Sequence, residues 1–285
     1  MGTNDAYGGS NSSAWNEFRQ AWAAAGAPPS GGADSEPGDQ GPGEPAEPPG
    51  VPPDALEALA AALARALLGS ATGTATQPTL ASLLPRRYGH GGTGTGGAVG
   101  TPGTPGRPGG RSGRQLQQQA ARGGAAVGAA TAYRQRDAAG LLQYGITLEE
   151  LDALTPRMRC ARLLDLVLGD AGHPDEAAVR KAAAQQVKRI LNPDEPSPSA
   201  VESVRDFIGE MTLQIGLVEL RDQILASQTT GQDATRKERG LRQWIAAKIR
   251  ALDLGRYGAV TSADCHRAAY VMIRDALRLL SPGRA

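Results

Sequence analysis

The sequence has few of the residues that build large hydrophobic cores or disulfide frameworks. Aromatic residues make up 4% of the 285 positions, only two of them Phe, whereas glycine and proline supply 38 and 20 residues. This composition predicts one folded domain that occupies only part of the chain. The two cysteines, Cys160 and Cys265, are far apart and form no CxxC motif, which favours a reducing compartment.

Long apolar runs and targeting signals are also missing. No stretch approaches the roughly 18 apolar residues that span a bilayer, so we expect no membrane segment. The first residues, from Met1 to Asp5, do not show the basic and then apolar pattern of a secretory signal. The expected location is therefore the cytoplasm.

Charge is distributed in blocks, although 30 Lys and Arg nearly balance 29 Asp and Glu. Between Arg19 and Arg65 there are seven acidic residues and no basic one. Residues 58–136 hold nine arginines and no acidic residue, and the rest of the chain is balanced. A net charge of +1 therefore hides an acidic block, a basic block and a balanced domain.

Two segments within these blocks are poor in apolar side chains. Residues 27–53 include nine Pro and six Gly, and residues 89–113 include twelve Gly. Neither segment can bury enough surface to offset the entropy of ordering, so both are predicted to be disordered linkers. The expected organisation is an N-terminal tail (1–26), an acidic linker (27–53), a short amphipathic helix (54–69), a basic Gly-rich linker (70–114) and a helical domain (115–285).

From residue 115 onwards, apolar residues recur with the period of a helix, and no segment alternates with the period of a strand. Thr147-x-x-Glu150 and Ser199-x-x-Glu202 are capping boxes that mark two helix starts. The predicted fold class is all-α, with a C-terminal helical bundle preceded by a long disordered Pro/Gly-rich N-terminal half.

Two finer expectations concern the start of this bundle. The Ala- and Gly-rich residues 115–142 predict a small-residue helix that breaks near Gly123 and Gly124, because glycine is a poor helix former. In the helix that begins at Pro156, Met158 and Leu163 are expected on the core side.

Two amphipathic segments lie in the N-terminal half. Trp15, Phe18 and Trp22 are spaced i, i+3 and i+7, which places them on one face of a helix. This face either folds back on the C-terminal domain or docks into a groove of a partner protein. The segment 54–69 carries a single stripe of leucines, typical of a packed or self-associating helix.

The matches to catalytic and metal-binding motifs in this sequence are no better than chance matches. Gly92-x-Gly94-x-x-Gly97 matches the dinucleotide-binding pattern, but it lies in a glycine-rich tract with no preceding strand. Cys265 and His266 are adjacent, which places them on different faces of a helix, whereas a metal needs three or four converging ligands. We therefore predict no catalytic residue, no cofactor and no metal.

The basic block leaves an alternative function open. Arginines in a flexible arm suit nonspecific nucleic-acid binding, and Arg107, Arg111 and Arg114 are the candidate contacts. Aromatic residues for base stacking are nearly missing there, with only Tyr88 and Tyr133. The competing interpretation is a solvated basic linker that pairs with the acidic block.

Two stretches carry a resemblance to a known family. The sequence Met-Gly-Thr-Asn-Asp-Ala-Tyr-Gly-Gly-Ser, followed by Trp15, resembles the start of the QatB family. Residues 145–156, Gly-Ile-Thr-Leu-Glu-Glu-Leu-Asp-Ala-Leu-Thr-Pro, are similar to the helical domain of that family, which also follows a glycine-rich spacer. The resemblance covers residues 1–22 and the region from Gly124 onwards. It implies a non-catalytic component of a bacterial anti-phage system, encoded with an ATPase, a QueC-like enzyme and a TatD-like nuclease.

The resemblance also suggests a role for Gly2. Removal of Met1 would leave a free α-amine on Gly2, and a QueC-like enzyme builds a deazaguanine from an activated carboxylate. We expect such a partner to acylate Gly2, and the alternative is ordinary N-terminal processing. Myristoylation is not expected, because Ala6 stands where that motif requires Ser or Thr. The predicted function is a scaffold or adaptor, modified at its N-terminus, with a nucleic-acid-binding adaptor as the alternative.

Overall fold

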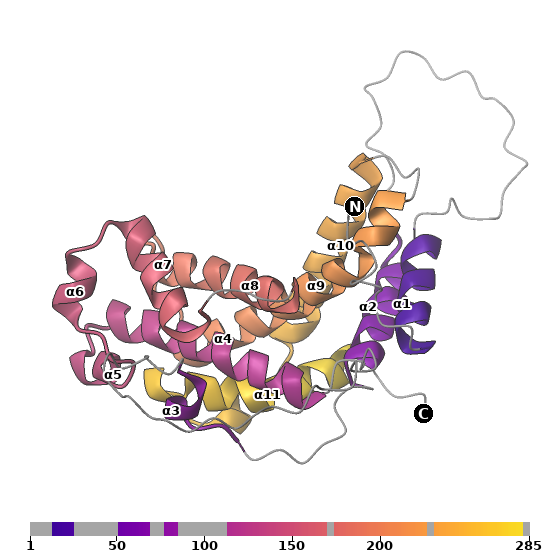
Figure 1. The fold of residues 1–285 in the computed structure, drawn as a ribbon. Helices are drawn as coiled ribbons and strands as arrows, with labels where there is room; N and C mark the ends of the chain where they lie inside the picture. The colour runs from indigo at the N-terminus through magenta and orange to yellow at the C-terminus, as the bar shows by residue number, and fades with distance from the viewer. Residues whose placement is uncertain are drawn as a thin grey trace, which may run out of the picture.

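The structure is a computed structural model that describes residues 13–25, 51–68, 77–84, 113–169, 174–226 and 231–281. Within these ranges the regular structure is all helical, with no strand, which confirms the predicted class (Figure 1). None of the described helices is both long enough and apolar enough to cross a bilayer. The helices are α1 (Ser13–Ala24), α2 (Pro53–Leu68), α3 (Leu80–Leu83), α4 (Gly113–Arg134), α5 (Ala138–Leu142), α6 (Leu148–Asp152), α7 (Pro156–Val167), α8 (Pro174–Leu191), α9 (Ala200–Ala226), α10 (Gly231–Arg250) and α11 (Cys265–Leu280), with 3-10 turns η2 (Leu254–Tyr257) and η3 (Ser262–Asp264) before α11.

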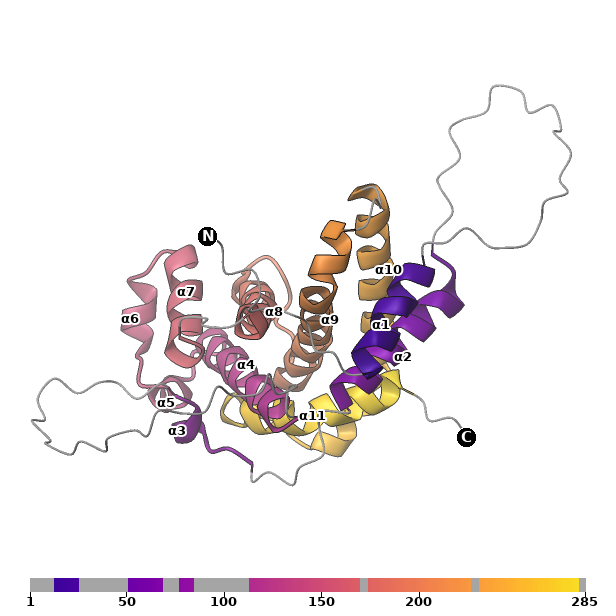
Figure 2. The ribbon, with the colours of Figure 1, turned by 45° about the vertical axis from the view of Figure 1, so that its right-hand side comes forward.

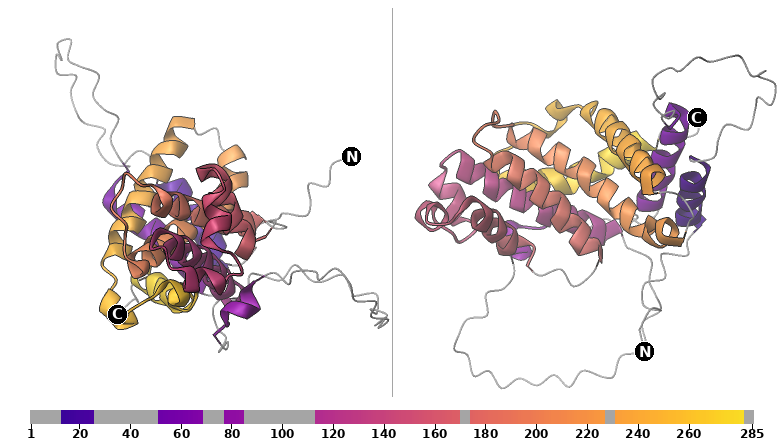
Figure 3. Two further views of the ribbon diagram at one scale, coloured as in Figure 1. Left: turned by 90° about the vertical axis from the view of Figure 1, so that its left-hand side faces the viewer. Right: turned by 90° about the horizontal axis from the view of Figure 1, so that it is seen from above.

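Helix α4 lies at the centre of the bundle. It packs against α7, α8, α9 and α11, while α10 packs on α9 and α2 packs on α10 and α11. The bundle is elongated, with α1 and α2 at one end and α5, α6 and α7 at the other (Figures 1 and 3).

Helix α4 continues through Gly123 and Gly124, so the predicted break there is wrong. A Cβ atom on Gly123 would lie 2.0 Å from Cζ of Phe207, and one on Gly124 would lie 2.5 Å from Cβ of Ala269. The glycines therefore serve close packing of α9 and α11 against α4, which outweighs their low helix propensity.

The predicted helix over 115–142 is instead interrupted after Arg134. Arg136 adopts a positive φ of 57°, which turns the chain. Asp137 then caps α5, because its carboxylate accepts a hydrogen bond of 2.8 Å from the amide of Gly140.

Both predicted capping boxes are present. Thr147 Oγ1 accepts from the amide of Glu150 at 3.2 Å, and Glu150 accepts from the amide of Thr147 at 3.0 Å. The pair Ser199 and Glu202 repeats this arrangement at 3.4 and 3.1 Å. Each box pairs two amide groups that a helix start leaves free.

The predicted position of Met158 is wrong. Its side chain is 56% exposed, whereas Leu163 is fully buried. Met158 precedes Leu163 by five residues, which is about 140° around a helix, so the two side chains point to different sides of α7.

The N-terminal helices belong to the same core as the bundle. Trp15, Phe18 and Trp22 are 1%, 0% and 4% exposed, and the leucine stripe of α2 is buried beside them. Their aromatic face is thus covered by the chain's own helices, as the first of the two interpretations expected, which corrects the docking interpretation. The segment 54–69, expected to form a packed or self-associating helix, forms α2, which contacts α1, α10 and α11. The predictions of disorder for the linkers concern residues that lie largely outside the described ranges.

Candidate functional site

A groove of about 290 Å³ runs along α9, with α8 on one side and α10 on the other. Figure 2 shows α9 between these two helices. We call this feature the α8–α10 groove. Its lining residues are Ala182, Gln185, Gln186 and Arg189 of α8, Arg205, Asp206, Gly209, Glu210 and Leu213 of α9, and Arg242, Ile245, Ala246, Ile249 and Arg250 of α10.

Small and apolar residues form the base of the groove. Ile245 and Ile249 are buried, and they pack α10 onto α9. Gly209 carries no side chain, and a Cβ atom there would meet Cδ1 of Ile249 only at 3.5 Å, an ordinary contact distance. Ala182 and Ala246 add little bulk on the two walls. The groove is therefore open because small side chains occur where three helices converge.

One end of the groove carries several arginines. Asp206 accepts a hydrogen bond of 2.7 Å from Arg189 and one of 3.0 Å from Arg205. Arg250, which follows Ile249, lines the same groove and is exposed. Arg189 and Arg205 thus hold one lining carboxylate, and Glu195 and Glu202 lie near the same two arginines.

The other end is balanced by acidic residues. Arg242 forms ion pairs with Glu210 across the α9–α10 contact and, at 3.0 Å, with Glu238 on its own helix. Gln214 donates a hydrogen bond of 2.6 Å to Glu210, which holds that carboxylate in place. The positive charge of Arg242 is therefore neutralised by two carboxylates of the protein itself.

Gln186 is the unusual residue of the groove wall. Its side chain is only 6% exposed, yet its amide nitrogen Nε2 has no hydrogen-bond partner among the described residues. Most buried polar groups in proteins are paired, and an unpaired buried donor costs about 1–3 kcal/mol. Gln186 lines the groove, although its Nε2 atom is itself enclosed by the protein.

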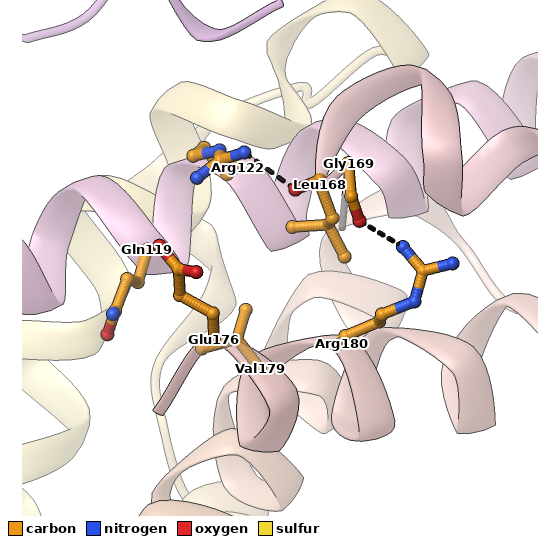
Figure 4. A pocket seen from close by; sticks show the side chains of 7 residues that line it. All are labelled: Gln119, Arg122, Leu168, Gly169, Glu176, Val179 and Arg180. Atoms are coloured by element: carbon orange, nitrogen blue, oxygen red, sulfur yellow. Dashed lines mark hydrogen bonds between the residues drawn. The ribbon is translucent and has the colours of Figure 1, made fainter. Parts of the chain in front are cut away.

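A second, much smaller cavity lies where α7 ends (Figure 4). Its volume of about 10 Å³ has room for about one water molecule. Arg122 donates to the carbonyl oxygen of Leu168 at 2.8 Å, and Arg180 donates to that of Gly169. These arginines cap carbonyl groups that the end of α7 leaves free, so we assign this cavity a structural role.

The segment that carries the family resemblance is held by a cluster of polar contacts. Asp152 accepts two hydrogen bonds from Arg136, at 2.8 and 2.7 Å, and a third from the hydroxyl of Tyr133 at 2.7 Å. The guanidinium of Arg159 lies 4.8 Å from the centre of the Tyr133 ring. These contacts hold α6 against the end of α4. A structural role therefore accounts for the residues that form them.

The structure does not place the residues proposed for modification or for nucleic-acid contact. Gly2, Arg107 and Arg111 lie outside the described residues, as does the side chain of Arg114. Four other arginines of the basic block bond within the fold: Arg65 to Glu17, Arg122 to α7, Arg134 to the Glu195 carbonyl and Arg136 to Asp152. These four arginines therefore already have partners within the protein.

Cys265 and His266 are both buried, and among the described residues no group of three or more metal-ligating side chains converges. Nδ1 of His266 lies 2.9 Å from the carbonyl oxygen of Ala263. Burial lowers the pKa of His266, which favours the neutral ring. Cys265 and His266 are thus buried residues of α11 that form part of the protein core.

Comparisons with protein families, with curated proteins and with solved structures find no significant match to this chain.

Proposed function

We propose that this chain is a non-catalytic adaptor that binds a partner protein through the α8–α10 groove. The observation that carries this proposal is the open groove of about 290 Å³ between α8 and α10, whose wall includes the buried, unpaired amide of Gln186.

The dimensions of the groove favour a peptide segment as the ligand. The lining residues span 182–189 on α8 and 242–250 on α10, which is about two turns of each helix, or roughly 12 Å. Its volume lies near the lower limit for drug-sized ligands, and no aromatic side chain lines it. A flat aromatic ligand would find no ring to stack on, whereas a helical segment matches a groove between two helices.

The resemblance to the QatB family suggests the setting. In this proposal the chain is the adaptor of a cytoplasmic anti-phage assembly, and its partners are an ATPase, a QueC-like enzyme and a TatD-like nuclease. Acylation of Gly2 by the QueC-like partner remains part of the proposal.

A steric block of the groove tests the proposal. Ala246 lines the groove, whereas its neighbour Ala247 is exposed outside it, so Ala246→Trp and Ala247→Trp form a matched pair. The chain and these variants are co-expressed with the proposed partners and recovered by affinity purification. We expect Ala246→Trp to lose at least one partner and Ala247→Trp to retain all of them, with the same thermal unfolding midpoint for both variants.

Two results would overturn the proposal. The first is equal partner recovery with Ala246→Trp and the original chain. The second is recovery of nucleic acid in place of protein partners. If that nucleic-acid binding weakens steeply with salt and disappears on charge reversal of Arg107, Arg111 and Arg114, the alternative function replaces the adaptor.

A further inference from the structure

We infer that α1 and α2 regulate the α8–α10 groove, because they pack on α10 from the side opposite the groove and hold that helix in place as a wall. We call α1 and α2 together the N-terminal pair. This inference rests on the proposed docking function and names the regulation of the same site. In Figure 2 the N-terminal pair lies next to α10.

Helix α10 has two opposite contact faces. On one face, Lys237 donates a hydrogen bond to the carbonyl oxygen of Trp22 in α1. On the same side, a Cβ atom on Gly240 would lie 3.2 Å from Cδ2 of Leu56 in α2. Ala246 lines the groove and follows Lys237 by nine residues, which is about 180° around a helix. The N-terminal pair and the groove are therefore on opposite sides of α10.

The position of α10 depends on the helices behind it and beneath it. Among the described elements, α10 packs on α9, α2 and α11. Helix α8, the other wall of the groove, packs on α9, and the groove separates it from α10. On the groove side α10 thus faces open space, so the N-terminal pair supplies support that α8 does not.

The N-terminal pair is attached to the bundle by contacts between residues that are distant in sequence. Residues 69–112 separate α2 from α4, and residues 25–52 separate α1 from α2. The pair therefore docks on α9, α10 and α11 through tertiary contacts. Supersecondary units of this kind open as cooperative units while the rest of the fold is retained.

The docked pair includes charged groups with little exposure. A guanidinium nitrogen of Arg19 lies 3.9 Å from the Glu219 carboxylate on α9, and the Glu219 side chain is 5% exposed. Lys237 is also buried. These charges lose hydration when the pair docks, which offsets part of the gain from burying Phe18. The docking equilibrium is therefore open to a shift by binding elsewhere.

The two sites are thus coupled through α10. When the N-terminal pair separates, α10 loses the support behind it and the groove loses a fixed wall. A partner held between α8 and α10 fixes α10 in turn and favours the docked pair, because coupling between two sites is reciprocal. The N-terminal pair is a positive regulator of docking in the groove.

Two leucine truncations separate this role from a general loss of stability. Leu56→Ala removes the side chain that α2 packs on Gly240 of α10. Leu80→Ala is the matched control, because Leu80 is also half-buried but belongs to α3, which packs on α4. Lys237→Met is a second test variant, which keeps most of the aliphatic stem but cannot donate to Trp22.

The distance between α8 and α10 is measured in the full chain with two spin labels. Lys188→Cys on α8 and Ala247→Cys on α10 carry the labels, since both positions are exposed and neither lines the groove. The two native thiols are buried. All variants are measured below their thermal unfolding midpoints, so that folded proteins are compared.

We expect one narrow distance distribution for the original chain and for Leu80→Ala. Leu56→Ala and Lys237→Met should add a second population at longer distance. In co-expression with the proposed partners, Leu56→Ala should lower partner recovery about fivefold or more, which is the usual lower range of coupling between sites. Leu80→Ala should leave partner recovery unchanged.

The failures of the two proposals are distinguishable. Unchanged distances in both test variants, or a longer population that leaves partner recovery unchanged, would overturn this inference while Ala246→Trp still blocks partner binding. If Ala246→Trp leaves partner recovery unchanged, the docking function itself is wrong, and the spin-label distances still test the support of α10 by the N-terminal pair.

Discussion

Lys237 donates a hydrogen bond of 3.0 Å to the carbonyl oxygen of Trp22, which joins α10 to the last turn of α1. The ammonium group also lies 5.4 Å from the centre of the Trp22 ring. The carbonyl is one that the end of a helix leaves free, and a cation there interacts favourably with the helix dipole. Burial lowers the pKa of Lys237, and Asp233 partly offsets this effect. Helix α1 is thus fixed to the bundle by polar as well as aromatic contacts.

The anchoring of α1 predicts a large effect of Phe18→Ala. The side chain is fully buried, so its truncation should lower the free energy of unfolding by about 3–5 kcal/mol. Gln20→Ala, an exposed change on the same helix, is the control and should have little effect. Urea unfolding of the isolated chain measures both. If Phe18→Ala leaves the midpoint unchanged, α1 does not pack on the bundle in the isolated chain.

Two Gly→Ala substitutions in helices should have opposite effects. A methyl group at Gly124 would lie 2.7 Å from the backbone oxygen of Cys265, so Gly124→Ala should destabilise the protein by about 2 kcal/mol. At Gly209 the nearest atom is the flexible end of Ile249 at 3.5 Å. Gly209→Ala should therefore stabilise the helix by about 0.5–1 kcal/mol through helix propensity. Thermal unfolding measures both changes, and a loss of stability in both variants would contradict the packing argument.

The bundle could be predicted from the sequence where local signals dominate. The capping box of Thr147 and Glu150 and the apolar spacing of α11 are local, and both are present in the structure. The continuity of α4 was predicted wrongly because it depends on Phe207, which lies more than 80 positions away and fills the space beside Gly123. Helix propensity depends only on the residues of one helix. Packing against other helices then decides whether that helix continues or breaks.

The candidate site could not be predicted in the same way. Arg189, Arg205 and Arg250 are ordinary surface residues in their own helices, and only the antiparallel packing of three helices brings them to one groove. Gln186 gives no signal in the sequence, because its lack of a partner is a property of the folded wall. A weak hint was available in Gly209, a glycine inside a strongly periodic helical segment.

Asp152 should make stability depend on pH in the acid range. Hydrogen bonds from Arg136 and then from Tyr133 lower the pKa of Asp152 to about 2, compared with about 3.9 in an unfolded chain. The lowered pKa means that its contribution to stability is complete above about pH 4 and is lost as the pH falls toward 2. Asp152→Asn should therefore be less stable than the original chain at pH 7, and this difference should close at pH 2. Chemical unfolding at several pH values measures it, with Asp194→Asn as the exposed control.

The two thiols should resist modification in the folded chain. Cys160 and Cys265 are both buried, and burial raises both pKa values, that of Cys265 to about 12. Because the thiolate is the reactive form, we expect no rapid reaction with a thiol-specific disulfide reagent at pH 8, and reaction of both thiols in guanidinium. Timed alkylation followed by mass spectrometry should modify Cys160 first, since it is 7% exposed whereas Cys265 is fully enclosed by α4 and α11. Modification of Cys265 at the rate seen in the unfolded chain would contradict the close packing of these two helices.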